Sequence, residues 1–257
     1  MNNRLDNELA ELCSSNNLSF DALQETINAL GPRVSSQNPL CVHPLCLHRA
    51  CKNKKVTLEI VQLLHSIWPG ALRLRNDNGY LPIRQLCCNI ELDDTASLDI
   101  LRFMLEIDPN LLREVGYDGR LPVHYAVMYK STAFCKKLID AYPESLRVRV
   151  GDGWFPSCHY GKRNDTADTI QYMLELDHEL INAEDRRRYL PIHRAALNGS
   201  TKSIELLLKY DPGAASKEIN NGNQVLPLHL ACGANNPNPI STILALYDAY
   251  PEAILIS

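Results

Sequence analysis

The sequence predicts an all-α repeat solenoid of about six to seven repeats, each consisting of a helix, a turn, a second helix and a hairpin-like loop. Two sequence markers support this prediction, because each recurs at intervals of 34 to 40 residues and the two keep a near-constant phase. A third observation is the apolar pattern between the markers, which has the period of an amphipathic helix.

The first marker is a leucine–proline motif that usually ends in histidine. Proline suits the first turn of a helix, where the missing N–H has no intrahelical partner. The apolar residues that follow predict a short first helix in each repeat. The marker occurs as LPIR at Leu81–Arg84, LPVH at Leu121–His124, LPIH at Leu190–His193 and LPLH at Leu226–His229, with degenerate copies LCLH at Leu45–His48 and FPSC at Phe155–Cys158.

The second marker ends a longer helix. In one copy Ile60, Leu63, Leu64 and Ile67 lie at i, i+3, i+4 and i+7, the spacing of an amphipathic stripe. The helix is expected to stop at the marker, because the residue before a proline is disfavoured in the α region. Copies of the marker end at Pro69, Pro109, Pro143, His178, Pro212 and Pro251.

A turn is expected between the second helix and the next leucine–proline motif. An extended stretch leads to glycine pairs that are typical of hairpin turns. These pairs are Asn78–Gly79, Asp118–Gly119 and Asp152–Gly153.

These residues resemble the ankyrin repeat, a unit of about 33 residues whose first helix opens with T-P-L-H-x-A. The copies most similar to it are LPIHRAA at Leu190–Ala196 and LPLHLAC at Leu226–Cys232, and the resemblance covers roughly residues 40–257. Leucine or phenylalanine replaces the family's N-capping threonine, which removes a cap worth about 1 kcal/mol per helix. The resemblance implies a structural role for the motif histidine, which bonds loop backbone between repeats.

The two ends of the chain depart from the regular pattern. Residues 1–40 are interpreted as an atypical N-terminal capping repeat with a helix at Asp21–Leu30, and residues 41–257 as one continuous array. At the C-terminal end Ala253–Ile256 is apolar and has no following repeat. Either this last unit pairs with another surface, or the chain is part of a longer protein.

Composition favours an intracellular protein without nucleic-acid or membrane partners. The net charge is −4, whereas binders of nucleic acid or of membrane surfaces usually have a basic excess. The N-terminus lacks the apolar run of a signal peptide, and no stretch approaches the ~18 apolar residues of a membrane span. Nine cysteines in a chain of this length are expected to be reduced thiols, in the cytoplasm or the nucleus.

A zinc site is the sharpest alternative in the sequence. Cys41, His43, Cys46, His48 and Cys51 bring five candidate ligands together. However, His48 and Cys51 fall on positions that the repeat itself explains, and the spacing matches no common zinc module. We therefore expect no metal site and no cofactor.

No catalytic residues are expected, and the chain is interpreted as a non-enzyme. The histidines recur once per repeat, so they cannot converge on one substrate, and the common nucleophile, zinc-protease and nucleotide-binding motifs are missing from the sequence.

Binding is expected on the concave face of the array, as is usual for repeat proteins. Tyrosine, tryptophan and arginine are enriched at interface hot spots. Such residues recur before the leucine–proline motif and after its histidine. For the tyrosines, packing of loop against loop is the alternative role. The predicted protein-binding residues are Tyr80, Arg120, Trp154, Tyr189, Arg49, Tyr125 and Arg194.

A second set of arginines precedes the turns at alternating spacing. Arg73, Arg75, Arg147 and Arg149 are expected to face solvent from extended segments, and a stripe for an acidic partner is the alternative.

The sequence therefore predicts a protein–protein interaction scaffold whose partner protein is unidentified. The alternatives are a regulatory or targeting segment of a larger enzyme or signalling protein, and a zinc-binding protein centred on Cys41–Cys51.

Overall fold

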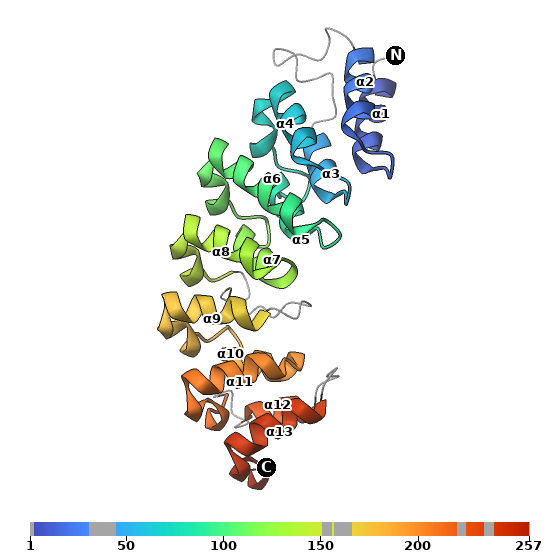
Figure 1. Cartoon of the computed structure of the whole chain (residues 1–257). Coiled ribbons are helices and arrows are strands. Elements are labelled where there is room, and N and C mark those ends of the chain that lie inside the picture. The colour runs from blue at the N-terminus through green and yellow to red at the C-terminus, as the bar shows by residue number, and fades with distance from the viewer. Residues whose placement is uncertain are drawn as a thin grey trace. The chain divides into compact units, whose positions relative to one another are not determined.

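The computed structural model describes residues 3–30, 45–150, 156, 166–219, 225–233 and 239–256. These residues form α-helices and five-residue 3-10 helices, and their one strand-like pairing is an isolated antiparallel bridge between Ile219 and Val225. The chain divides into two compact units, residues 1–130 and 131–257 (Figure 1). No helix in the described part is both long enough and apolar enough to cross a membrane.

The first unit is built of helix pairs. One row contains the first helix of each pair, with α1 packed on α3, α3 on α5 and α5 on α7, and a second row packs α2 on α4 and α4 on α6. The elements are α1 (Asn3–Ser14), α2 (Phe20–Leu30), α3 (Cys46–Lys52), α4 (Leu58–Ile67), η3 (Pro69–Arg73), α5 (Pro82–Cys88), α6 (Asp94–Ile107), η4 (Pro109–Arg113) and α7 (Pro122–Tyr129).

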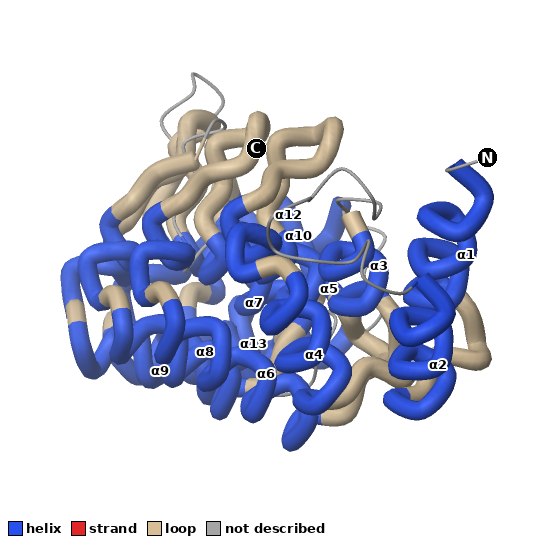
Figure 2. Tube along the Cα trace, turned by 90° about the horizontal axis from the view of Figure 1, so that it is seen from above, coloured by secondary structure: helices blue, strands red, loops and turns tan. Residues whose placement is uncertain are grey.

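The second unit repeats this arrangement. Its first helices pack α10 on α12, and its second helices pack α8 on α9, α9 on α11 and α11 on α13. The elements are α8 (Thr132–Ala141), η5 (Pro143–Arg147), α9 (Thr166–Leu176), η7 (His178–Asn182), α10 (Pro191–Asn198), α11 (Thr201–Tyr210), η8 (Pro212–Ser216), α12 (Pro227–Gly233), α13 (Pro239–Ala249) and η9 (Pro251–Leu255). Helices account for nearly all of the regular structure (Figure 2), and this confirms the all-α repeat fold.

The leucine–proline motif starts a helix, as predicted. Pro82, Pro122, Pro191 and Pro227 are each the first residue of a short helix. The leucine before Pro82, Pro122 and Pro191 makes no side-chain cap bond. The missing cap is therefore a real feature of these helices.

The second helices bury an apolar stripe. In α4 the fully buried residues are Ile60, Val61 and Leu64, while Leu63 and Ile67 are only half-buried. The prediction is thus correct for Ile60 and Leu64, but the buried face of the helix also includes Val61 and leaves Leu63 and Ile67 only half-buried. The helix begins at the side chain of Thr57, which accepts a bond from the N–H of Ile60.

The segment after the second marker differs from the prediction. We expected an extended stretch, but a 3-10 helix such as Pro69–Arg73 comes first, with Ala71 and Leu72 buried in it. Proline favours this turn because it occupies the first helical position, and the pair of buried residues holds it against the core. The extended backbone starts only at the following residue, Leu74.

The glycine turns are confirmed where the structure describes them. Gly79 and Gly119 have φ of 70° and 71°, in the left-handed region that favours glycine. The same turn position in the following LPIH repeat is Arg188, with φ of 61°. Asp152–Gly153 lies outside the described residues.

The N-terminal residues form a helix pair, which is consistent with a repeat-like unit. The predicted helix at Asp21–Leu30 is α2, and α1 precedes it. The amide of Asn53 donates to the carbonyl oxygens of Cys13 at 3.1 Å and Ser15 at 2.7 Å, so the turn of this pair is bonded to the next repeat. The domain boundary at residue 40 stays a prediction, because residues 31–44 lie outside the described part.

Candidate protein-binding surface

The structure brings three of the predicted binding residues together in the first unit. Tyr80 and Arg120 are half-buried on the turns before α5 and α7, and Tyr125 lies in α7. The ring of Tyr125 meets that of Tyr80 edge-to-face, with 6.2 Å between the ring centroids. Arg49 is half-buried on α3. Trp154 lies outside the described residues.

The expected exposure is wrong for two residues. Tyr125 is 3% exposed and Arg194 is 7% exposed. Both follow the motif histidine and were expected to face solvent. They are buried because each packs on polar and aromatic groups of its own turn, namely Asp118 for Tyr125 and Tyr189 for Arg194.

Arg84 completes the cluster of the first unit, and the sequence analysis did not single it out. Its guanidinium carbon lies 4.3 Å from the ring centroid of Tyr80 and 4.8 Å from that of Tyr125. Both distances are within the range of a cation–π contact. We call Tyr80, Arg84 and Tyr125 the Tyr–Arg–Tyr cluster. The signal that could have found it is the arginine of LPIR, which replaces the histidine of the other motifs.

Asp118 fixes one edge of this cluster. Its carboxylate accepts a bond from the hydroxyl of Tyr125 and another from the backbone N–H of Arg120, at 3.2 Å. The Arg120 side chain is only loosely associated, at 3.9 Å from the carboxylate. Burial, with the bond to Asp118, raises the pKa of Tyr125 far above its ordinary value, so the phenol stays protonated.

The second unit contains a related cluster around Tyr189. The guanidinium carbon of Arg194 lies 4.5 Å from the Tyr189 ring centroid, and the ring of His193 stacks beside it at 6.1 Å. Asp185 accepts a bond from Nε of Arg194 at 2.8 Å and a second from its Nη2. Tyr189, Arg194 and Asp185 therefore form a closed ion-pair cluster.

The turn before Tyr80 has an amide where the turn before Tyr189 has a carboxylate. Asp185 also accepts bonds from two N–H groups of its own turn, including that of Tyr189 at 3.0 Å. Asn76 takes the same position before the LPIR motif and accepts from the N–H of Asn78 and of Tyr80, at 3.1 and 3.0 Å. An amide supplies the turn bonds without a charge. The turn before Tyr80 thus has the same backbone bonds as the turn before Tyr189, but it lacks the carboxylate.

Adjacent turns in the first unit interlock through glycine and tyrosine. A Cβ placed on Gly116 would lie 2.3 Å from the ring of Tyr80, and one on Gly79 would lie 2.5 Å from the ring of Tyr117. The loop-against-loop role considered for Tyr80 is therefore real, although its ring stays half-buried. Tyr117 remains 80% exposed and is an aromatic contact residue that the sequence analysis missed.

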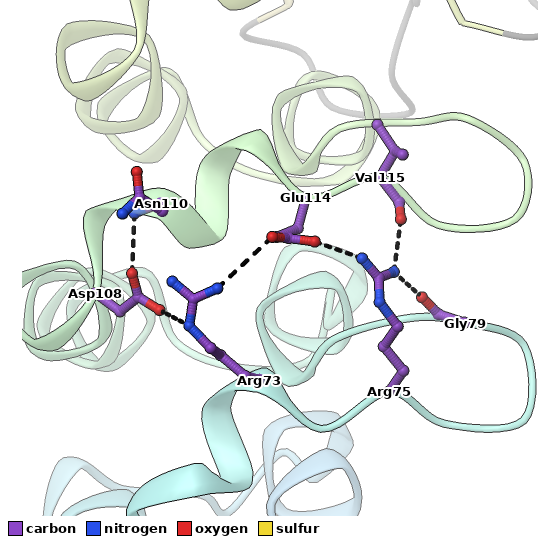
Figure 3. Close-up of polar contacts among 7 residues, drawn as sticks. All are labelled: Arg73, Arg75, Gly79, Asp108, Asn110, Glu114 and Val115. Carbon is purple, nitrogen blue, oxygen red and sulfur yellow. Dashed lines mark hydrogen bonds and ion pairs between the residues drawn. The ribbon is translucent and has the colours of Figure 1, made fainter.

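The arginines before the turns are exposed, as expected, and Arg73 and Arg75 also pair within the chain (Figure 3). Nε of Arg73 lies 2.6 Å from the carboxylate of Asp108, and Nη1 lies 3.7 Å from Glu114. Arg75 forms an ion pair with Glu114 and donates to two turn carbonyl oxygens at 2.6 and 2.7 Å. The acidic partners of these arginines are carboxylates of the following repeat.

The same contact recurs in the second unit. Arg147 lies 2.6 Å from the carboxylate of Asp177 and 2.9 Å from that of Glu179. These pairs are more than half exposed on the arginine side, so each contributes little to stability. Their position identifies them as contacts between successive repeats.

The motif histidines form structural bonds, as the resemblance implied. Nδ1 of His193 accepts from the N–H of Leu190 at 3.1 Å, and Nε2 bonds the carbonyl of Lys217 at 3.0 Å. Burial lowers the pKa of His193 to about 4. His229 bonds Leu226 and Ala253 in the same manner.

The residues of the zinc alternative are only partly described. Cys46 and Cys51 are buried in α3, and Nε2 of His48 bonds the carbonyl of Tyr80 at 2.8 Å. Burial raises the pKa of Cys51 to about 12, so its thiol is protonated. Cys41 and His43 lie outside the described residues. Among those described, no group of His, Cys, Asp and Glu is placed to hold a metal ion.

Comparison with known proteins adds family information. No family model matches the chain. The chain is 27% identical over 131 residues to the ankyrin repeat protein nuc-2 of Neurospora crassa, which covers 51% of this chain and 12% of that protein. It is 22% identical over 162 residues to the nuclear factor NF-kappa-B p105 subunit of Gallus gallus, which covers 62% and 16%.

One further relative and one solved structure are also similar to this chain. The transient receptor potential cation channel subfamily A member 1 of Drosophila melanogaster is 25% identical over 128 residues, which covers 47% of this chain and 10% of that protein. The chain thus spans less than a fifth of each of these relatives. A chain in the structure of the Bd0816 predatory endopeptidase from Bdellovibrio bacteriovorus in complex with immunity protein Bd3460 matches with a TM-score of 0.61 and 20% identity, covering 79% of this chain and 96% of that one.

The structural match supports the fold alone, whereas the relatives named above are ankyrin-repeat proteins. The leucine–proline motif, the helix pairs with their glycine turns and the structural histidines agree with that family. In sequence pattern and fold, this chain is therefore similar to ankyrin-repeat proteins.

Proposed function

We propose that the chain is a non-catalytic scaffold that binds a partner protein. The binding surface comprises the first helices and the turns that precede them, which form the concave face in an ankyrin array. The observation that carries this proposal is the presence of half-buried Tyr80 and Arg120 on successive turns of the first unit, beside Arg49 on a first helix. In the second unit Tyr189 is half-buried at the equivalent turn position. Tyrosine and arginine are hot-spot residue types at protein interfaces.

The chemistry of the histidines supports a non-catalytic role. In the described repeats His193 and His229 each use both ring nitrogens for backbone bonds of the fold. A general base needs a free nitrogen within reach of its substrate. Both nitrogens of these imidazoles are therefore used in hydrogen bonds of the fold.

The test is capture of a partner, followed by a binding measurement with purified components. We expect the wild-type chain to retain a protein from a lysate of its source, and a Tyr80→Ala, Tyr189→Ala variant to bind the purified partner at least about tenfold more weakly. The control is Tyr172→Ala, Tyr210→Ala, which removes two tyrosines from the second helices α9 and α11. Equal losses in both variants would place the interface elsewhere and refute the proposed surface.

A second candidate is a regulatory or targeting segment of a larger enzyme or signalling protein. It is favoured by the relatives, because the matched regions make up only 10% to 16% of those proteins. Sequencing the complete transcript distinguishes the two candidates, since a catalytic domain in the same reading frame supports the second.

A further inference from the structure

Beyond the N-terminal helix pair, charge differs between the two rows of helices. The first helices α3, α5, α7, α10 and α12 contain no aspartate or glutamate, although the chain as a whole has a net charge of −4. Acidic residues lie instead on α1, with Asp6, Glu8 and Glu11, and on second helices such as α6. In the first unit α3 and α5 contribute Arg49, Lys52 and Arg84. These two helices are therefore basic on an acidic protein.

Among the described residues, Arg84 has no carboxylate partner, unlike Arg73, Arg75, Arg147 and Arg194. Arg73 and Arg75 pair with acidic residues of the next repeat, and Arg194 pairs with Asp185. Within the described ranges, no carboxylate lies within ion-pair distance of Arg84, and its buried Nε has no hydrogen-bond partner. Asn76 stands where the second unit has the carboxylate of Asp185.

The surroundings of Arg84 prepare it for an external carboxylate. The rings of Tyr80 and Tyr125 hold the guanidinium in place and remove part of its hydration. A cavity of about 10 Å³ lies among these three side chains, Arg75, Arg120 and Glu114, which is about the room that one water needs. Nη1 of Arg84 donates to the side-chain oxygen of Gln85 at 3.4 Å, whereas the Nε–H is unsatisfied. A positioned guanidinium with a free N–H is a strong donor to a carboxylate.

We propose that helices α3 and α5 of the first unit bind an acidic peptide segment of the partner, with an aspartate or glutamate side chain on Arg84 and further acidic residues facing Arg49 and Lys52. This inference rests on the proposed scaffold function and names the chemistry of the partner. An acidic protein segment is a more suitable ligand than nucleic acid. A chain with a net charge of −4 repels the many phosphates of a nucleic acid.

The test uses a fluorescein-labelled peptide of alternating glutamate and alanine, and fluorescence anisotropy reports its affinity for the full chain. A glutamine–alanine peptide and an oligothymidine of equal length are the comparison probes. We expect the acidic peptide to bind at least about tenfold more tightly than the glutamine peptide, and its affinity to fall as salt rises from about 50 to about 200 mM. Equal affinity for the two peptides, or preference for the oligothymidine, overturns the proposal.

Arg84→His is the decisive variant. Histidine occupies this motif position in LPVH, LPIH and LPLH, so the variant is expected to fold, with an unfolding transition close to that of wild type. We expect it to bind the acidic peptide roughly tenfold more weakly. The control Arg102→Gln removes the same charge from α6 and should change affinity less than about twofold. Equal effects of the two variants would refute a specific role for Arg84.

The two proposals can fail separately. A purified partner that needs Tyr80 and Tyr189, but keeps its affinity in Arg84→His and at higher salt, leaves the scaffold function standing and refutes the acidic segment. A partner that is insensitive to all of these changes refutes both.

Discussion

At the scale of single residues, the motif histidine supplies part of what the absent threonine cap would supply. In His124, His193 and His229, Nδ1 accepts a bond from the N–H of the leucine before the helix. Nε2 of His193 and His229 bonds a backbone carbonyl farther along the chain, so it must carry the proton. The bond accepted by Nδ1 requires a neutral imidazole, because a protonated nitrogen has no lone pair to accept it. The fold is therefore coupled to the protonation state of the motif histidine.

Stability should fall in mild acid because of His193. Burial lowers its pKa from an ordinary 6.5 to about 4, so the unfolded chain binds a proton more readily than the folded chain. The stabilisation is complete above pH 6.5 and is lost as the pH falls toward 4, amounting to roughly 3 kcal/mol. Urea unfolding between pH 7 and 4.5 measures this loss. His193→Gln should flatten the pH profile, and a slope equal to that of wild type would contradict the assignment.

At the scale of elements, polar side chains connect the turns between first and second helices in the first unit. The amide of Asn89 donates to the carbonyls of Cys51 and Asn53, each at 3.0 Å, and Asn53 bonds the N-terminal pair in the same manner. In the next repeat Nζ of Lys130 donates to the carbonyl of Asn89 at 2.7 Å. These bonds hold successive turns together where no helix packing does.

Asn89→Ala tests this connection. Asn89 is 6% exposed and also accepts from the N–H groups of Glu91 and Leu92, at 3.2 Å each. Its removal leaves several buried backbone groups unpaired, so we expect a loss of about 2–4 kcal/mol in the free energy of unfolding. Asn110→Ala, at an exposed position of η4, should cost no more than about 0.5 kcal/mol. Similar costs in the two variants would show that Asn89 does not connect the repeats.

Helix order and turns were predictable from the sequence because they depend on local chemistry. The proline of each motif sets the first helical position, and glycine at positions 79 and 119 permits the left-handed turn. The 3-10 helices were missed because a proline stop does not reveal which backbone follows it. The left-handed conformation of Arg188 was not predicted, because arginine rarely adopts that conformation.

The candidate surface was predictable only in part. Register identified Tyr80 and Tyr189, since position within the repeat is readable in sequence. The burial of Tyr125 and Arg194 could not be predicted from the sequence. It depends on the carboxylates of Asp118 and Asp185, which only the folded turns place beside these two side chains. Arg84 could have been identified from the arginine of LPIR, but its contacts with the rings of Tyr80 and Tyr125 depend on the folded turns.

At the scale of the whole molecule, the main packing contacts of each described helix are with helices of its own repeat and of the neighbouring repeats. In the second unit α11 packs on α9 and α13. In such arrays stability is a sum of repeat and nearest-neighbour terms, so damage to one repeat should spread along the array in steps. Hydrogen exchange tests this, because it measures the local opening of each helix separately.

Leu207→Ala should therefore unfold the second unit locally. Leu207 is 1% exposed in α11, and its truncation should cost about 2–5 kcal/mol. We expect hydrogen-exchange protection to fall first in α9, α11 and α13, while α4 and α6 of the first unit keep theirs. The matched control is Leu244→Ala on α13, where the side chain is 52% exposed and the cost should stay below about 1 kcal/mol. A uniform loss of protection along the chain in Leu207→Ala would mean that the repeats unfold as one cooperative body, and that nearest-neighbour stacking does not limit the spread of damage.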